Sequence, residues 1–261
     1  MKRRIDLVLV DRGFAESRQK AQALLLAGQV LVGEQKIEKA GQLVDPEADI
    51  RILGRLQFAS RAGAKLQAAL DYFQIRVAGE ICADLGASTG GFTDCLLQNG
   101  ACRVYAFDVG KGQLAWKLRS DPRVVVRDEF NVRNLTPSDF PEEISFVCID
   151  LSFISVTKIL PALKTALISG GAPRKGECQE LPADVIVLVK PQFEVGKGEV
   201  GKGGIVRDPV KRVKALECVS EFAAQAGFRV VGSIPSPVAG AQGNQEFLLH
   251  LQLVKSLLFL P

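Results

Sequence analysis

Two lysines and two acids stand where they could carry out proton chemistry: Lys65, Asp150, Lys190 and Glu246. Asp150 and Lys190 each end an apolar run that indicates a buried strand, and solubility explains a lysine there poorly. Lys65 lies near the start of an expected helix, and Glu246 opens the last expected strand. A lysine whose pKa is lowered by its surroundings can accept or hold the proton of a hydroxyl group. The alternative is a structural network of ion pairs, because such networks also perturb pKa values.

A glycine-rich turn lies between an apolar strand and a helix in the run D-L-G-A-S-T-G-G-F, residues 84–92. Glycine permits positive φ and a close backbone approach, and a helix start offers free N–H groups. A second acid, Asp108, closes the next strand, where a carboxylate can hold a ribose diol. Because the spacing differs from the G-x-G-x-x-G of dinucleotide sites, we expect S-adenosylmethionine as the ligand. The alternative is a strand-to-helix turn that binds nothing.

The elements that must position these residues follow from an alternation of apolar runs and helical patterns. The predicted strands are 81–85, 104–107, 124–126, 145–149, 185–189, 229–233 and 246–253, and the predicted helices are 63–73, 92–99, 113–118, 155–167 and 209–226. Such alternation indicates parallel βαβ units. We expect an α/β, doubly wound, Rossmann-like methyltransferase sheet, with five parallel strands and an antiparallel hairpin at its edge. Asp84, Asp108, Asp150 and Lys190 then share the carboxyl edge of the sheet, where such sheets bind ligands.

Residues 1–58 have the pattern of a separate small α+β module, and residues 59–261 form the second predicted domain. Helical patterns over residues 5–10 and 18–27, the latter capped by Ser17, precede short strands at 29–32, 36–37 and 50–52. Basic residues exceed acidic ones at the start of the module, and such a patch can follow RNA phosphates. The candidate RNA-binding residues are Arg3, Arg4, Arg12, Arg18 and Lys20. The alternative is an ordinary solvated helix face.

Composition limits the class of protein, its metal content and its location in the cell. With 261 residues, 47% hydrophobic residues and a net charge of +4, the chain fits a globular protein for which a nucleic-acid partner is permitted but not required. Its six cysteines include no C-x-x-C pair, which predicts reduced thiols, and its single histidine, His250, leaves little material for a metal site. No apolar run approaches membrane length. We therefore expect a cytoplasmic protein without a bound metal.

Missing motifs narrow the acceptor atom. No Asn/Asp-Pro-Pro-Tyr/Phe motif follows the fourth strand, which disfavours methylation of an exocyclic amine, and the absence of Pro-Cys removes the usual thiolate for attack on a pyrimidine carbon. Oxygen is the expected acceptor. The run 196–203 matches G-x-x-x-x-G-K, but Gly203 stands where a phosphate loop needs Ser or Thr. We expect instead a flexible loop that presents Lys197, Lys202 and Arg207 over the substrate cleft.

The chain resembles the TlyA (hemolysin A) family of RNA ribose 2′-O-methyltransferases, which is related to the FtsJ-like enzymes, over nearly its whole length. Its first segment resembles the S-four type RNA-binding module. The remaining matching runs are S-R-A-G-A-K-L (60–66), D-L-G-A-S-T-G-G-F-T-D (84–94), V-Y-A-F-D-V-G (104–110), N-V-R (131–133), D-L-S-F-I-S (150–155) and V-K-P-Q-F-E (189–194).

This resemblance implies the fold above, S-adenosylmethionine as cofactor and RNA, in particular ribosomal RNA, as substrate. It implies a catalytic set of Lys65, Asp150, Lys190 and Glu246. The cofactor contacts that it implies are Asp84, Gly86, Ser88, Thr89, Gly90, Asp108 and Asn131, with Asn131 near the adenine. Two rival functions are an RNA-binding protein with a vestigial methyltransferase domain and a membrane-active hemolysin. Nothing in the sequence supports lysis, because no basic amphipathic helix or apolar span is visible.

Overall fold

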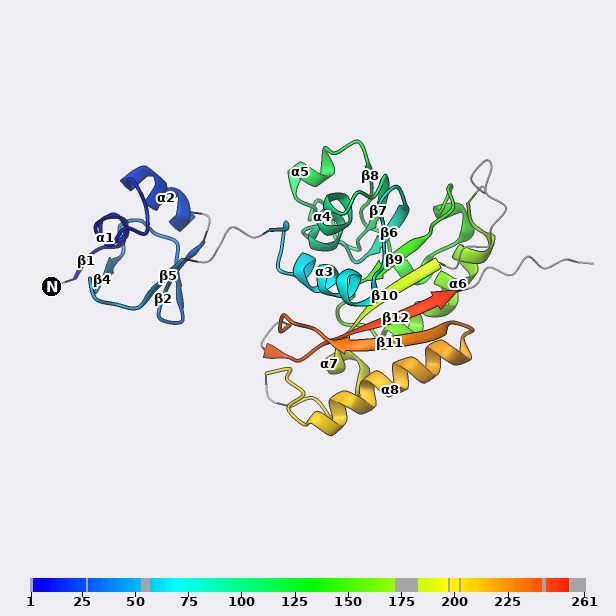
Figure 1. Ribbon diagram of the computed structural model, residues 1–261. Helices are drawn as coiled ribbons and strands as arrows, with labels where there is room; N and C mark the ends of the chain where they lie inside the picture. Colours follow the sequence, from blue (N-terminus) through cyan, green and yellow to red (C-terminus); the bar gives the residue numbers. More distant parts are fainter. Residues whose placement is uncertain are drawn as a thin grey trace, which may run out of the picture. The chain divides into compact units, whose positions relative to one another are not determined.

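The chain divides into two compact units, residues 1–56 and residues 57–261. The structure, a computed structural model, describes residues 2–26, 28–52, 57–171, 183–196, 198–201, 203–240 and 243–253 (Figure 1). The boundary predicted between residues 58 and 59 lies close to this division.

The first unit packs two helices beside small antiparallel sheets. Its elements are β1 (Arg3–Arg4), α1 (Ile5–Asp11), α2 (Arg18–Leu26), β2 (Val30–Val32), β3 (Gln35–Ile37), β4 (Leu43–Val44) and β5 (Ile50–Ile52). β2 pairs with both β3 and β5, and the short pair β1 and β4, which we did not predict, forms a second sheet. The predicted cap is present, because Ser17 Oγ accepts a hydrogen bond from the Lys20 N–H at 3.2 Å. Apolar residues of both helices form the core with Val30 and Ile37.

The second unit is built on one seven-stranded sheet in the order β11-β12-β10-β9-β6-β7-β8. Its strands are β6 (Ile81–Leu85), β7 (Arg103–Phe107), β8 (Val124–Arg127), β9 (Phe146–Ile149), β10 (Ala183–Val189), β11 (Arg229–Pro235) and β12 (Phe247–Leu253). The five strands from β10 to β8 are parallel, and β12 pairs antiparallel with both β10 and β11. The predicted sheet with an antiparallel edge hairpin is therefore confirmed.

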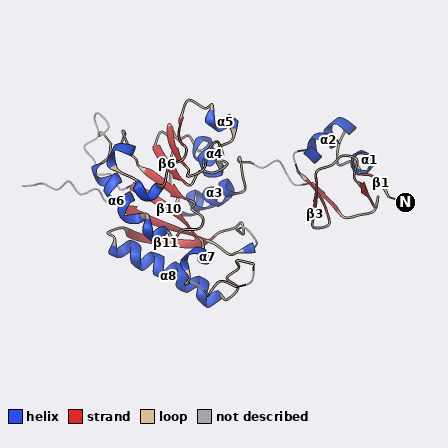
Figure 2. Cartoon of the chain, turned by 180° about the vertical axis from the view of Figure 1, so that it is seen from behind, coloured by secondary structure: helices blue, strands red, loops and turns tan. Residues whose placement is uncertain are grey.

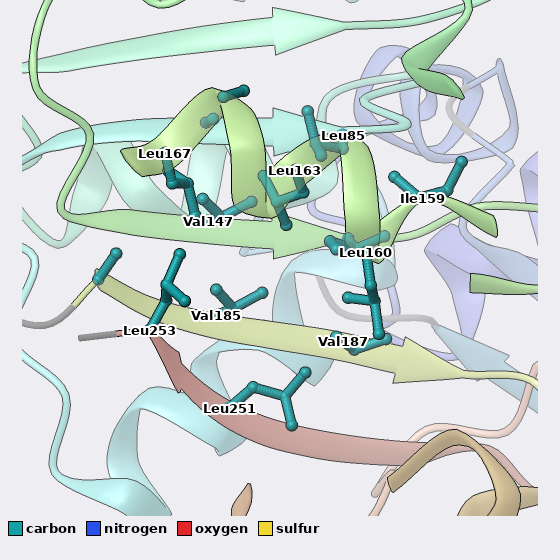
Figure 3. Close-up of a cluster of buried hydrophobic side chains, with 14 of the residues drawn as sticks. Leu85, Val147, Ile159, Leu160, Leu163, Leu167, Val185, Val187, Leu251 and Leu253 are labelled. Carbon is teal, nitrogen blue, oxygen red and sulfur yellow. The ribbon is translucent and has the colours of Figure 1, made fainter. Parts of the chain in front are cut away.

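Helices cover both faces of this sheet (Figures 1 and 2). One face carries α3 (Ala62–Phe73), α4 (Gly91–Gln98) and the short α5 (Trp116–Arg119), and the other carries α6 (Leu160–Ser169) and α8 (Pro209–Gln225). Val185 and Val187 of β10 belong to the α6 side (Figure 3), whereas Ile186 and Leu188 belong to the α3 side. This two-sided burial explains why β10 is continuously apolar.

Two predicted helices differ from the observed ones. The predicted helix 113–118 shrinks to α5, because Gly112 takes a φ of +67° and Ala115 is extended. The predicted helix 155–167 splits into a 3₁₀ turn, Val156–Lys158, and α6, which begins beside Pro161, a residue that favours a first helical turn. Of the loop residues predicted to lie over the substrate cleft, Lys197 and Lys202 lie outside the described residues, as do residues 172–182.

Candidate active site

The carboxyl edge of the sheet brings the four candidate catalytic residues to one region. β9 lies between β6 and β10, and the register Leu85↔Ile149 places Gly86 beside Asp150. A Cβ added to Gly86 would lie 2.3 Å from the Asp150 carbonyl oxygen, so only glycine fits there, and its φ of +95° also favours glycine. The register Val189↔Phe247 then carries Lys190 opposite Glu246.

Lys190 and Asp150 form the first ion pair of the site. Lys190 Nζ lies 2.6 Å from Asp150 Oδ1, and both side chains are mostly buried. Lys190 Nζ donates a hydrogen bond to Ser152 Oγ at 3.0 Å, whereas its contact with Asp150 Oδ1 is an ion pair without hydrogen-bond geometry. A carboxylate and a hydroxyl therefore fix the position of this amine at the end of β10.

Lys65 and Glu246 form the second pair. Lys65 Nζ donates to Glu246 Oε2 at 2.5 Å, and the two side chains are only 9% and 2% exposed. A Cβ on Gly240 would lie 2.0 Å from Glu246 Oε1. The observed position of the Glu246 carboxylate therefore requires glycine at position 240. The first turns of α3 and the start of β12 thus supply one buried charge each, and burial is tolerated because the charges neutralise each other.

A cavity of about 940 Å³ opens beside the first pair: Asp150 and Ser152 line it, whereas Lys190, Lys65 and Glu246 do not. It is lined by the loops that follow β6, β7, β8 and β9, together with Phe193 from the segment after β10. Of the residues predicted to hold the cofactor, Gly86, Ser88, Asp108 and Asn131 line it. Thr89 is exposed outside the lining, and Gly90 packs against leucines, because a Cβ there would lie 2.3 Å from Leu118 Cδ1.

Asp108 organises the rim of the cavity. Its two carboxylate oxygens accept hydrogen bonds from the backbone N–H groups of Ser88, at 2.8 Å, and Gly110, at 2.7 Å. These bonds hold Ser88 in the left-handed region, at a φ of +47°. A carboxylate has about four acceptor positions, so each oxygen keeps one for a ligand hydroxyl. Asn131 Oδ1 accepts from the Arg133 N–H and thereby caps the 3₁₀ turn Val132–Asn134.

Asp84 lies beneath the glycine turn and not on the cavity wall. It is fully buried, Oδ2 accepts from Thr93 Oγ1 at 2.6 Å, and no described residue makes a hydrogen bond to Oδ1. Burial raises the pKa of this carboxyl to about 7, although the Thr93 hydroxyl acts in the opposite direction. The observed bond joins the end of β6 to α4 across the turn.

This raised pKa predicts the stability of an Asp84→Asn variant. The unfolded carboxyl loses its proton near pH 4 and the folded one near pH 7, so the carboxyl lowers stability progressively as the pH rises between those values. Asparagine resembles the protonated acid. We expect similar melting temperatures near pH 4, and a variant that melts higher than wild type at about pH 8. Thermal unfolding at both pH values tests this, and an equal difference at both would mean that Asp84 titrates normally.

The sequence-based predictions missed several residues that the fold brings to the cavity. Ser152 contacts Lys190, and Phe153 stands 91% exposed at the rim with a φ of +64° and its ring centroid 5.2 Å from that of Phe193. Glu194 is largely buried and accepts from Ser155 Oγ at 2.5 Å and the Val156 N–H at 3.0 Å, which ties the segment after β10 to the loop after β9. Burial raises the pKa of Glu194. All lie within or beside the runs D-L-S-F-I-S and V-K-P-Q-F-E. Nothing in the local sequence distinguishes them as site residues from their neighbours in these runs.

The predicted RNA-binding residues of the first unit are mostly engaged within it. Arg4 and Arg18 both pair with the buried Asp6, whose pKa is held well below its usual range chiefly by the hydrogen bond from Arg4. The remaining three are also bonded, Arg3 to Asp11, Lys20 to Glu16, and Arg12 to the carbonyl oxygens of Pro46 and Ala48. Arg4 and Arg18 therefore have a structural role within the first unit, because they neutralise the buried Asp6.

Two kinds of feature are absent from the described part of the chain. No group of three His, Cys, Asp or Glu side chains is arranged to hold a metal ion there. Among the same residues, no helix has the length and apolar character needed to cross a membrane.

Comparison with known proteins agrees with a Rossmann-like sheet whose carboxyl edge carries a glycine turn and a cavity. Residues 58–253 match the FtsJ-like methyltransferases and residues 3–50 match the S4 domain. The chain belongs to the FtsJ-like methyltransferase family and carries an S4 domain.

Individual relatives cover nearly the whole chain. The 16S/23S rRNA (cytidine-2′-O)-methyltransferase TlyA of Mycobacterium tuberculosis (strain ATCC 25618 / H37Rv) is 44% identical over 251 residues, 95% of this chain and 89% of that protein. YqxC of Bacillus subtilis (strain 168), proposed to be an rRNA methyltransferase, is 46% identical over 252 residues, 96% of this chain and 85% of that protein. A Streptococcus thermophilus structure, of a protein proposed to be a hemolysin, gives a TM-score of 0.72 at 43% identity and covers 98% of this chain and 90% of that chain.

Proposed function

We propose that this chain transfers a methyl group from S-adenosylmethionine to a ribose 2′-hydroxyl of RNA, in particular ribosomal RNA. The observation that carries the proposal is the pair of lysine–carboxylate contacts, Lys190 with Asp150 and Lys65 with Glu246, at the sheet edge where Asp150 lines a large cavity. Such groups can position and deprotonate a hydroxyl, whereas the chain has no motif for amine or ring-carbon methylation.

The cavity fits this cofactor. Its volume, about 940 Å³, lies at the upper end of the range for small-molecule sites. Gly86 presents bare backbone to it, and Asp108 offers two acceptor positions to a ribose diol. Asn131, on the same wall, can face the adenine. When bound, S-adenosylmethionine supplies a methyl group activated by a positively charged sulfur.

Lys190 is the residue that we assign to the acceptor hydroxyl. Its Nζ lies 2.6 Å from Asp150 Oδ1, at the end of β10. In its neutral form the Lys190 amine can accept at Nζ the proton that the ribose hydroxyl loses while its oxygen takes the methyl group from sulfur. Asp150 and Ser152 orient Nζ, while Lys65 and Glu246 neutralise each other at the neighbouring position.

RNA is the substrate class that the rest of the chain supports. The S4 domain supplies the candidate phosphate-binding residues, and the exposed ring of Phe153 at the rim of the cavity is a surface on which a nucleobase can stack. The relative from Mycobacterium tuberculosis is named as an rRNA methyltransferase, and the same substrate would place the activity of this chain in the cytoplasm.

The decisive experiment follows a labelled methyl group. The protein is incubated with S-adenosylmethionine carrying a tritiated methyl group and with ribosomal RNA or ribosomal subunits from cells that lack the protein. Label in alkali-resistant 2′-O-methyl dinucleotides supports the proposal. Label on a base would overturn the assignment of the acceptor, and RNA binding without transfer would favour a vestigial methyltransferase domain.

Asp108 provides a test of the cofactor site. We expect Asp108→Ala to weaken S-adenosylmethionine binding by about ten- to a hundredfold, because hydrogen bonds to a charged group contribute about 1.5–3 kcal/mol. Calorimetry measures this affinity directly. Asp128→Ala is the matched control, since Asp128 also accepts from a loop N–H group, that of Gly112, but lies outside the cavity lining. Equal affinities for wild type and Asp108→Ala would remove Asp108 from the site.

A further inference from the structure

The charge along α8 is arranged against the helix dipole. Cations lie in its first two turns, at Lys211, Arg212 and Lys214, and Arg207 lies just before the helix, whereas the acids Glu217 and Glu221 come later. The amino end of a helix carries a partial positive charge, so cations there lower helix stability and acids would raise it. The first turn contains no acid, although Asp208 caps the helix through the Val210 N–H. A helix surface that served only solubility would not need cations in its first turns.

The cations at this end are available to a partner. Arg207 and Lys214 are exposed, and neither lies within 4 Å of a carboxylate oxygen in the described residues. Lys214 is still near Glu199, because it helps the Gly196 N–H and Lys211 to lower the pKa of that carboxyl. Lys211 Nζ lies 3.5 Å from Glu199 Oε1, a loose surface contact, and the Lys211 side chain is 40% exposed. Arg212 differs, because its guanidinium donates to the carbonyl oxygens of Val206 and Arg207 and holds the preceding segment against the helix. We call Arg207, Lys211 and Lys214 the basic start of α8.

The basic start of α8 is fixed to the active-site edge. Asn244 is 2% exposed, its Oδ1 accepts from the Val206 N–H at 3.0 Å, and its Nδ2 donates to the Gly204 carbonyl at 2.9 Å. Only one residue separates Asn244 from Glu246, which pairs with Lys65. The helix α8 also packs against α7 (Pro191–Glu194), which directly follows Lys190 (Figure 1). A group bound at the basic start of α8 therefore has a defined position relative to the candidate catalytic residues.

We propose that the basic start of α8 binds the sugar–phosphate backbone of the RNA substrate and orients it toward the active site. The proposal rests on the proposed function in taking RNA as the substrate, and it adds a second RNA-contacting surface outside the S4 domain. Three cations reinforced by a helix amino end attract phosphate oxygens, which fix register without reading sequence. The occupant is thus a phosphate backbone and not a nucleobase.

The test uses the full chain with Arg207, Lys211 and Lys214 all changed to glutamine. The probes are deproteinised ribosomal RNA and intact ribosomal subunits, and binding is measured without cofactor over a range of salt concentrations. Loss of three phosphate contacts should weaken binding to the RNA by at least about tenfold, and should reduce the slope of log affinity against log salt by about two to three. Affinity for S-adenosylmethionine should stay at the wild-type value. The melting temperature of the variant should equal or exceed that of wild type, because the substitutions remove positive charge from the amino end of the helix.

The matched control removes three cations near the opposite edge of the same unit. Arg76 precedes β6, Arg229 begins β11, and Lys164 lies beside Gly227, the residue two before Arg229. Their change to glutamine alters net charge equally and should leave RNA binding and its salt slope almost unchanged. An equal loss in both triple variants would show a general charge effect and overturn the proposal. Unchanged RNA binding in the α8 variant would also overturn it, and weaker binding to subunits alone would identify a ribosomal protein as the occupant. Because binding is measured without methyl transfer, failure of the proposed activity is detected separately.

Discussion

Lys190→Ala should methylate RNA about 10²- to 10⁴-fold more slowly than wild type, because a group that activates a hydroxyl by proton transfer usually contributes a factor of that size. Its affinity for S-adenosylmethionine should stay close to wild type, because Lys190 does not line the cavity and the residues assigned to the cofactor lie on other loops. Single-turnover transfer of labelled methyl groups to ribosomal RNA measures the rate, and calorimetry measures the cofactor affinity.

Two further variants separate the possible roles of Lys190. Lys190→Arg keeps a positive charge beside Asp150 but cannot release a proton near neutral pH, so it should remain slow if Nζ accepts the hydroxyl proton. Recovery of activity in Lys190→Arg would indicate that only the charge matters. Lys164→Ala, on α6, is the matched control and should retain the wild-type rate. Near-normal turnover of Lys190→Ala would instead favour a structural network of ion pairs.

Removal of the S4 domain should abolish efficient methylation while leaving cofactor binding intact. Phe58 is 4% exposed in the core of the second unit, and Asp94 Oδ2 accepts from the Ala59 N–H at 2.8 Å. The deletion should therefore remove residues 1–56 and keep this anchor. Two linked binding surfaces commonly gain about 10²–10⁴ in avidity over one, and we expect a loss of that size in kcat/KM for ribosomal RNA.

The division of this loss between KM and kcat tests the role of the domain. If the S4 domain supplies only affinity, saturating RNA should restore the rate of the shortened protein, and its binding should depend less steeply on salt than that of the full chain. Calorimetry with S-adenosylmethionine controls for folding of the shortened protein. Full-rate methylation at low RNA concentration would show that the domain is dispensable.

The sequence determined the architecture because its signals are local. The alternation of apolar runs with helical patterns indicated βαβ units, and the observed sheet has five parallel strands with β12 antiparallel beside β10. The turn glycines were predicted to permit positive φ and close backbone approach, and Gly86 takes a φ of +95° beside the Asp150 carbonyl oxygen. Helix lengths were less well predicted, because Gly112 and Pro161 reshape short segments without changing hydrophobic periodicity.

Only the tertiary structure decided how the charged residues pair. Lys65 and Glu246 are far apart along the chain, and their 2.5 Å contact depends on α3 packing against β12. The same holds for Asp84, which the family resemblance assigned to the cofactor contacts but which lies buried beneath the turn and accepts a hydrogen bond from Thr93. The sequence pattern can place a residue at the end of a strand. The burial of its side chain, its pKa and its bonding partner depend on residues from other elements of the fold. The residue types therefore indicate the chemistry, and the packing of the sheet decides which of them can reach a ligand.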